Sequence, residues 1–100
     1  MGSESISFQG SITVANSSAM RLAIRTALRQ RPTELVIDFS GVTYMDSSAV
    51  ATLIEALRIA NTQQTRLTIA GLGEQPRYLM DVIRLDRLFH ITTLEANANS

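Results

Sequence analysis

The sequence predicts one α/β domain, in which a small mixed, largely parallel sheet of about four strands has helices packed against it. The main indication is the order of the hydrophobic patterns, which switch repeatedly between the period of a strand and that of a helix. A chain of 100 residues, of which 45% are apolar, is also long enough to bury one core. We expect the folded core to span about residues 5–93, with a polar tail at 95–100 that frays.

The first predicted elements are a strand and a helix. Apolar and polar residues alternate over residues 6–14, with Gly10 at the position of a kink or bulge. Three residues of helix-capping type follow: Asn16, Ser17 and Ser18. The helix runs to about Gln30, because Pro32 pushes the residue before it out of the helical region. Its predicted inward side chains lie at helical spacing: Met20, Ile24, Ala27 and Leu28.

A buried strand and a second helix form the middle of the chain. Residues 35–39 are almost continuously apolar, with Val36 pointing inward, as in a central strand. A tight loop then leads to the polar cluster Asp46-Ser47-Ser48, and an apolar helix of small residues follows over about residues 47–61. Its predicted core side chains are Val50, Leu53, Ile54 and Leu57.

The last third of the chain completes the alternation. We predict a strand over residues 66–71, a helix over 74–83 and a short strand over 88–92. The third helix is expected to turn Leu79, Val82 and Ile83 inward. This alternation predicts largely parallel neighbouring strands joined by right-handed crossovers. In open α/β sheets, functional loops gather at the carboxyl ends of the strands, and the loop around Asp46 follows a strand and opens a helix, as expected of such a loop.

The composition excludes several classes of protein. Nine basic and nine acidic side chains give a formal charge of zero, which does not fit a dedicated nucleic-acid binder. The absence of cysteine excludes disulfides, thiol chemistry and cysteine metal sites. No apolar run approaches the roughly 20 residues of a membrane span, and no secretion signal is visible. We therefore expect a cytoplasmic protein without direct membrane insertion.

Catalytic and metal sites find little support in the sequence. A nucleophilic serine needs a base, and the only histidine is His90, which lies among apolar neighbours in the last predicted strand. The acids Asp38, Asp46 and Glu55 do not have the spacing of a metal site. The glycines of the segment 71–73 lack the remainder of a phosphate-binding loop. We expect no enzymatic activity, no metal and no cofactor.

Covalent switching is the chemistry that the polar cluster favours. Ser47 is expected at a helix N-terminus, where unpaired backbone donors and the helix dipole tolerate an anion. A phosphate there adds a charge of about −1.5 to −2 and would repel a partner that docks on the cluster and the small side chains after it. The alternative is structural, because Asp46 or Ser47 could simply cap the second helix. The expected contact residues are Asp46, Ser47, Ser48, Ala49, Val50 and Thr52.

The first predicted helix carries a basic stripe. Arg21, Arg25 and Arg29 recur every fourth residue, and no acid in that helix offsets them. The stripe is either a solvated face or a secondary surface for an acidic protein. It lacks the wide apolar face of a membrane binder and the aromatic platforms of a nucleic-acid binder.

The polar cluster and its lead-in resemble the signature of STAS domains (sulfate transporter and anti-sigma factor antagonist). Val42-Thr-Tyr-Met45 precedes Asp46-Ser47-Ser48, and the segment at 84–91 resembles the closing segment of that family. The resemblance covers about residues 10–92. It implies a non-enzymatic domain. In the bacterial anti-sigma factor antagonists, the hydroxyl residue directly after the aspartate is phosphorylated by a serine kinase that is itself the anti-sigma factor. Here that residue is Ser47.

The same resemblance leaves other roles open. In the antagonists, phosphorylation dissolves the complex with the kinase, and a phosphatase resets the switch, so that the domain regulates transcription. Other STAS domains are accessory subunits of ABC-type lipid transporters, docked on the ATPase or permease through the same loop and helix. A signalling module within a larger stress-sensing complex is a third role.

Three features depart from the antagonist pattern. Ala49 stands where antagonists usually have glycine, and the segment 10–13 lacks their early acid. The few residues before Gly10 leave little room for the usual leading strand. A missing strand would expose a sheet edge that must be protected or paired, and a homodimer through this edge is one solution.

Overall fold

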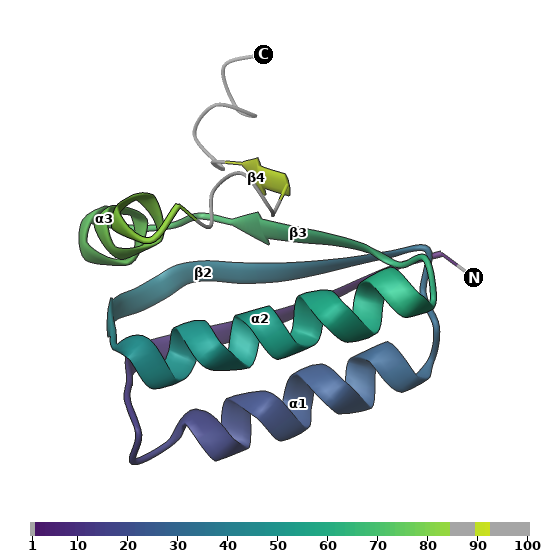
Figure 1. The fold of residues 1–100 in the computed structure, drawn as a ribbon, viewed down its shortest axis with the longest axis horizontal. Coiled ribbons are helices and arrows are strands. Elements are labelled where there is room, and N and C mark those ends of the chain that lie inside the picture. Colours follow the sequence, from purple (N-terminus) through teal and green to yellow (C-terminus); the bar gives the residue numbers. More distant parts are fainter. Residues whose placement is uncertain (1, 85–89, 93–100) are drawn as a thin grey trace.

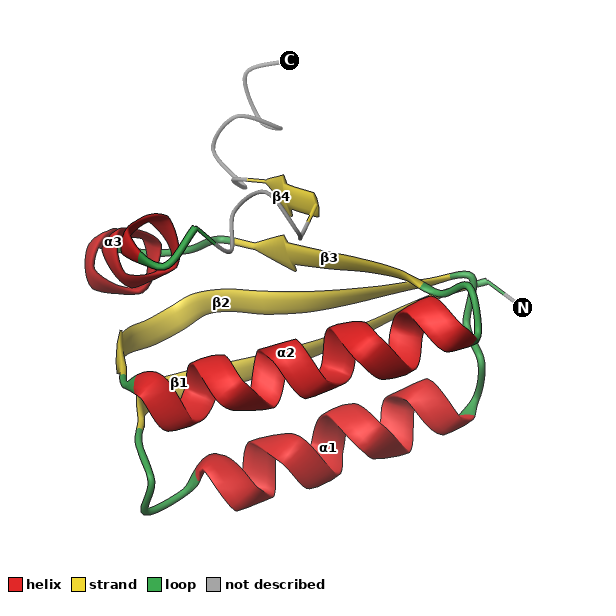
Figure 2. Ribbon diagram, viewed as in Figure 1, coloured by secondary structure: helices red, strands yellow, loops and turns green. Residues whose placement is uncertain are grey.

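The computed structural model describes residues 2–84 and 90–92 and confirms the predicted α/β alternation (Figures 1 and 2). The elements in chain order are β1 (Ser3–Ile12), α1 (Ser17–Arg29), β2 (Glu34–Met45), α2 (Ser47–Thr62), β3 (Arg66–Ala70), α3 (Glu74–Val82) and β4 (His90–Thr92). The strands form one four-stranded sheet in the order β1-β2-β3-β4. Every described pair is parallel, so the mixed character expected from the sequence is not seen among these strands.

Helices α1 and α2 lie side by side against one face of the sheet (Figure 2). The core forms beneath them, because Leu35, Ile37 and Phe39 alternate along β2 and are fully buried. Val36 lies between these residues and is only half-buried, so its predicted inward orientation was wrong. In a strand, successive side chains point to opposite faces, and Val36 belongs to the face that α1 and α2 do not cover.

Strand β2 is longer than the sequence predicted. The expected tight loop after residue 39 is part of the strand, which continues to Met45 because β1 pairs with it along this segment. The register between the two strands shifts twice, once between Ser7 and Gln9 and once between Gly10 and Ser11 of β1. Each shift places one extra residue in β2. Gly10 has a φ of +77°, which explains glycine at the predicted kink.

Helices α1 and α2 bury the faces that their spacing predicts, with some additions. In α1 the buried side chains are Met20, Ile24 and Leu28, whereas Ala27 is half-buried. In α2, Val50 and Leu53 are buried, and Ile54 and Leu57 are half-buried. Small side chains complete the buried face of α2: Ala49, Thr52, Ala56 and Ala60. These small residues let α2 approach the sheet and α1 closely.

Helix α3 is oriented differently from the prediction. Its buried side chains are Pro76 and Met80, Leu79 is half-buried, and Val82 is 58% exposed. Ile83 follows the helix and is also exposed. The helix packs at the carboxyl-terminal part of β2 (Figure 1), so a face set by Pro76 and Met80 points inward.

The described residues of the last predicted strand, His90–Thr92, pair with β3. Residues 88 and 89 and the predicted tail at 95–100 lie outside the described part of the chain. Within residues 2–84 and 90–92, no helix combines the length and the apolar character that a membrane span requires. The outer edge of β1 has no strand partner among these residues, as the sequence suggested.

Candidate functional site

The polar cluster lies where β2 ends and α2 begins. Met45 is the last residue of the strand, Asp46 is extended (φ −112°, ψ −172°), and Ser47 is the first residue of the helix. This junction is at the carboxyl ends of the parallel strands, beside the loop that joins β1 to α1 (Figure 1). The structure therefore places the cluster at the edge of the sheet where α/β proteins gather their functional loops.

The Asp46 carboxylate connects two segments. Its Oδ1 atom accepts hydrogen bonds from the backbone N–H groups of Ser48 (2.9 Å) and Ala49 (3.4 Å), and from the Ser48 hydroxyl (2.5 Å). Its Oδ2 atom accepts a bond from the backbone N–H of Val14, at 3.2 Å. Asp46 is thus the N-cap of α2, the structural role that the sequence left open, and it also fixes the β1–α1 loop.

These bonds decide the ionisation of Asp46. The Ser48 hydroxyl has the largest effect and lowers the pKa of this carboxyl. Desolvation has the next largest effect and raises the pKa, and the backbone N–H groups of Ser48, Ala49 and Val14 each lower it, so that the net shift is downward. The carboxylate is therefore ionised at neutral pH and is a weak base. It is not suited to take a proton from a neighbouring hydroxyl, which argues against a nucleophilic serine activated by Asp46.

The two serines of the cluster differ in accessibility. Ser48 is half-buried, and its hydroxyl donates to Asp46. Ser47 is exposed, and its hydroxyl has no hydrogen-bond partner in the described part of the chain. Ser47 also lies at the positive end of the α2 dipole, in a first turn that contains no acidic residue. An incoming enzyme can reach the Ser47 hydroxyl without breaking an existing hydrogen bond.

The small side chains that the sequence predicted as a contact surface after the cluster are not accessible. Ala49, Val50 and Thr52 are 0%, 6% and 7% exposed, so they belong to the core. The Thr52 hydroxyl donates to the carbonyl oxygen of Ser48, at 3.0 Å, within the helix. The prediction failed because the start of α2 is enclosed by α1 and the sheet. Ala51 is the exposed residue one turn after Ser47.

Two residues of the site had escaped the sequence analysis. Val14 is 78% exposed and is bonded to Asp46 through its backbone, so an apolar side chain lies beside the cluster. Gln75, from α3, accepts a hydrogen bond from Met45 N (2.9 Å) and donates one to Met45 O (3.0 Å). Neither belongs to a local motif, and both come to the site through the fold.

The basic stripe of α1 meets an acid from the neighbouring helix. Glu55 of α2 receives Arg21 Nε at 2.8 Å and Arg25 Nη1 at 3.3 Å. Arg29, one turn further, has no ion pair within the described residues. The stripe is thus partly neutralised from α2, which the sequence of α1 alone did not reveal.

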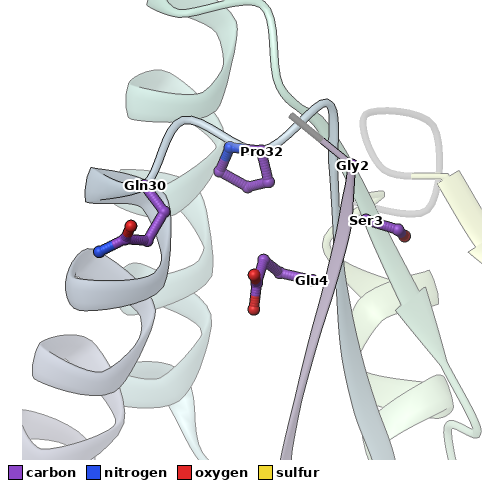
Figure 3. Close-up of a pocket in the computed structure, with 5 residues that line it drawn as sticks. All are labelled: Gly2, Ser3, Glu4, Gln30 and Pro32. Carbon is purple, nitrogen blue, oxygen red and sulfur yellow. The ribbon is translucent and has the colours of Figure 1, made fainter.

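A hollow of about 240 Å³ lies at the other end of the sheet, by the amino ends of β1 and β2 (Figure 3). Its lining residues are Gly2, Ser3, Glu4, Gln30 and Pro32. Neither Asp46 nor Ser47 contributes to it. Within residues 2–84 and 90–92, no group of three or more acidic or histidine side chains is arranged to hold a metal ion. The side chain of His90 lies outside the description.

Solved structures of related fold include proteins of two kinds. An anti-sigma factor antagonist from Mycobacterium paratuberculosis aligns with a TM-score of 0.83 and 23% identity, covering 95% of this chain and 81% of that one. A putative anti-sigma factor antagonist from Thermotoga maritima aligns with a TM-score of 0.82 and 13% identity, covering 94% and 83%. The STAS domain of a SulP transporter from Vibrio cholerae gives 0.73 and 14%, covering 94% and 76%. At sequence identities below 25%, this structural similarity shows a shared fold and nothing more.

The family itself follows from a match over nearly the whole chain. The family model described as "Mlab, STAS domain" matches residues 2–93. This span includes the four described strands, helices α1 and α2, and the Asp46-Ser47-Ser48 cluster. The chain belongs to the STAS domain family.

Proposed function

We propose that this protein is a non-enzymatic regulatory binding domain of the antagonist type. It binds an anti-sigma factor that is a serine kinase, in the cytoplasm, and is switched by phosphorylation of Ser47. The observation that carries the proposal is the contrast between the two serines: the Ser47 hydroxyl is exposed and unbonded among the described residues, whereas the Ser48 hydroxyl is bound to Asp46.

Phosphorylation would act through charge. The kinase transfers the γ-phosphoryl group of ATP to Ser47 Oγ, ADP leaves, and the hydroxyl proton passes to a base of the kinase. A phosphatase reverses the step with water and releases inorganic phosphate. The new charge of about −1.5 to −2 lies beside a carboxylate that is already ionised, so the surface becomes strongly negative. A partner that tolerates the hydroxyl is then repelled, with no need to refold the domain.

The contact surface differs from the one that the sequence suggested. Asp46, Ser47 and Ser48 stay at its centre, and the exposed side chains of Val14 and Ala51 replace the buried ones of α2. Val14 supplies an apolar contact close to the charged cluster. Such a combination of a polar centre and an exposed apolar side chain suits a reversible protein interface.

A second function is favoured by the comparisons. The matching family model carries the description "Mlab, STAS domain", and transporter STAS domains are among the structures of similar fold. These matches support a transporter role in general, and the transporter role that the sequence left open is an accessory subunit of an ABC-type lipid transporter, docked on its ATPase or permease through the same loop and helix. In that role Ser47 is a contact residue and its phosphorylation is not required.

Pull-down from native host lysate distinguishes the two functions. The baits are the wild-type chain, Ser47→Asp and, as a matched control, Ser47→Ala, with mass spectrometry as the readout. Recovery of a serine kinase by wild type and Ser47→Ala, but not by Ser47→Asp, supports the antagonist. The kinase and ATP must then add one phosphate to wild type and none to Ser47→Ala. Recovery of an ABC ATPase or permease assigns the chain to the transporter class.

A further inference from the structure

The second half of β2 lacks a strand partner on one side. Strand β3 pairs only with residues 34–38 of β2, although β2 continues to Met45. Along this remainder, β1 pairs with the opposite edge, and α3 packs where the β3 side would otherwise be open. The backbone groups of β2 that face α3 therefore need partners from side chains or water.

The side chain of Gln75 takes the place of a strand at Met45. Its Oε1 atom accepts from Met45 N at 2.9 Å, and its Nε2 atom donates to Met45 O at 3.0 Å. A primary amide is the side-chain group that offers one acceptor and one donor in this arrangement. Gln75 is half-buried, which shields both bonds in part from competing water. We call this pair of bonds the Gln75 clamp.

The clamp acts directly before the polar cluster. Met45 is bonded to Gln75 on one side, and the next residue, Asp46, donates its backbone N–H to Ile12 O on the other side, at 3.1 Å. Asp46 is then held from α3 and from β1 at once. Its carboxylate in turn fixes the first turn of α2, and Ser47 is the residue between these fixed points.

We propose that Gln75 is a positioning residue for the Ser47 site and that α3 is part of the unit that presents Ser47 to a partner. The proposal rests on the proposed function, because it is Ser47 recognition and phosphorylation that the clamp would serve. A shift of α3 is transmitted to Ser47 through Met45 and Asp46. Gln75 itself need not touch the partner.

The matched test compares two glutamines. Gln75→Met keeps the length of the side chain and removes both bonds of the clamp. Gln63→Met is the control, because Gln63 also uses its amide on the backbone, donating to Leu28 O at 2.8 Å, and on the Thr65 hydroxyl, at 2.9 Å. Gln63 lies just past the C-terminal end of α2, away from Ser47. Any general effect of losing two partly buried side-chain amide bonds appears in both variants.

Hydrogen exchange of the full chain gives a readout that needs no partner. For Gln75→Met, the amides of Met45, Ser48 and Ala49 should exchange about tenfold faster than in wild type, with unchanged exchange at Ile37 in the central sheet. For Gln63→Met, these three amides should match wild type. Unchanged exchange at Ser48 and Ala49 in Gln75→Met, or equal acceleration in both variants, overturns the proposal.

A pH-dependent variant separates positioning from loss of packing. In Gln75→Glu, the ionised carboxylate accepts from Met45 N but cannot donate to Met45 O, whereas the protonated acid does both. The ratio of variant to wild-type exchange should therefore fall toward one as pH drops through about 4.3. Wild type carries the same Asp46 cap, so any effect of Asp46 protonation is present in both proteins of the ratio. A ratio that is independent of pH contradicts the clamp.

Phosphorylation kinetics complete the test with the kinase recovered by pull-down. Gln75→Met should lose about tenfold in kcat/KM for Ser47, and Gln63→Met should keep the wild-type value. Equal values for Gln75→Met and wild type overturn the role in presentation. If wild type itself accepts no phosphate, the proposed function fails, and the exchange experiment still decides whether Gln75 positions the first turn of α2.

Discussion

The Asp46 carboxylate accepts a hydrogen bond from the backbone N–H of Val14, at 3.2 Å, across 32 positions of sequence. The same carboxylate caps α2 through Ser48 and Ala49. One side chain therefore locks the β1–α1 loop to the start of the second helix. The candidate switch at Ser47 is built on a rigid junction, which favours a mechanism based on surface charge over one based on refolding.

Acid should weaken the domain through Asp46. Because the folded-state pKa is lowered, the carboxylate contributes stability that is present above its unfolded pKa of about 3.9 and is lost as pH falls through the folded value. Urea unfolding of wild type and Asp46→Asn between pH 7 and pH 2 measures this. We expect wild type to be the more stable at pH 7 and the difference to vanish at low pH. A difference that persists at pH 2 would show that ionisation is not the cause.

Ser47→Asp should leave the fold intact. The side chain is exposed and lies at the positive end of the α2 dipole, so a negative charge there is expected to stabilise by about 0.3–1 kcal/mol, or to be neutral. Thermal unfolding followed by circular dichroism checks this. Loss of partner binding by the same variant would then reflect charge. A fall in the melting temperature would point to a structural defect.

Ser48→Ala should behave differently from Ser47→Ala. The Ser48 hydroxyl donates to Asp46 and gives the largest lowering of that pKa, so its removal should raise the pKa of Asp46. NMR titration of the Asp46 carboxyl carbon measures the change. In Ser47→Ala the titration should match wild type, because Ser47 has no bond to Asp46 among the described residues. Phosphorylation should survive Ser48→Ala and vanish in Ser47→Ala.

The hydrophobic core should be sensitive at Phe39. This side chain is fully buried in β2 and meets the ring of Phe8 edge-on, with 6.3 Å between centroids. Phe39→Ala should lower the free energy of unfolding by about 3–5 kcal/mol. Leu22→Ala is the control, because Leu22 is 65% exposed, and its loss should cost less than about 0.5 kcal/mol. Urea denaturation of both variants ranks them, and equal losses would contradict the assigned core.

The ion pair between α1 and α2 should add little stability. Arg21 and Glu55 are 51% and 34% exposed in their side chains, and such pairs contribute about 0–1 kcal/mol. A double-mutant cycle with Arg21→Ala and Glu55→Ala measures the coupling, which should shrink as salt is added. A coupling free energy well above about 1 kcal/mol that does not change with salt concentration would instead indicate a buried network of charges.

Most of the secondary structure followed from local sequence patterns. The errors arose where contacts with a distant segment of the chain decided the structure. The spacing of Met20, Ile24 and Leu28 identified α1 because a helix that covers a sheet must be apolar on one side. The segment Ser40-Gly41 looked like a turn, and it became a bulge because β1 lies alongside it. The exposed Val82 was assigned to the core, because spacing cannot tell which neighbour a short helix will meet.

The sequence by itself determined the order of strands and helices and the place of the Asp46-Ser47-Ser48 cluster at the start of α2, because these depend on interactions within a few residues of the chain. It left open whether Asp46 or Ser47 caps the helix, and the structure assigns the cap to Asp46. Only the tertiary structure decided that Ala49, Val50 and Thr52 are buried, that Glu55 neutralises part of the α1 stripe, and that Val14 and Gln75 hold the junction. These contacts join residues about 30 or more positions apart. Which of these contacts form depends on how the helices pack on the sheet, and this packing cannot be predicted from local sequence patterns.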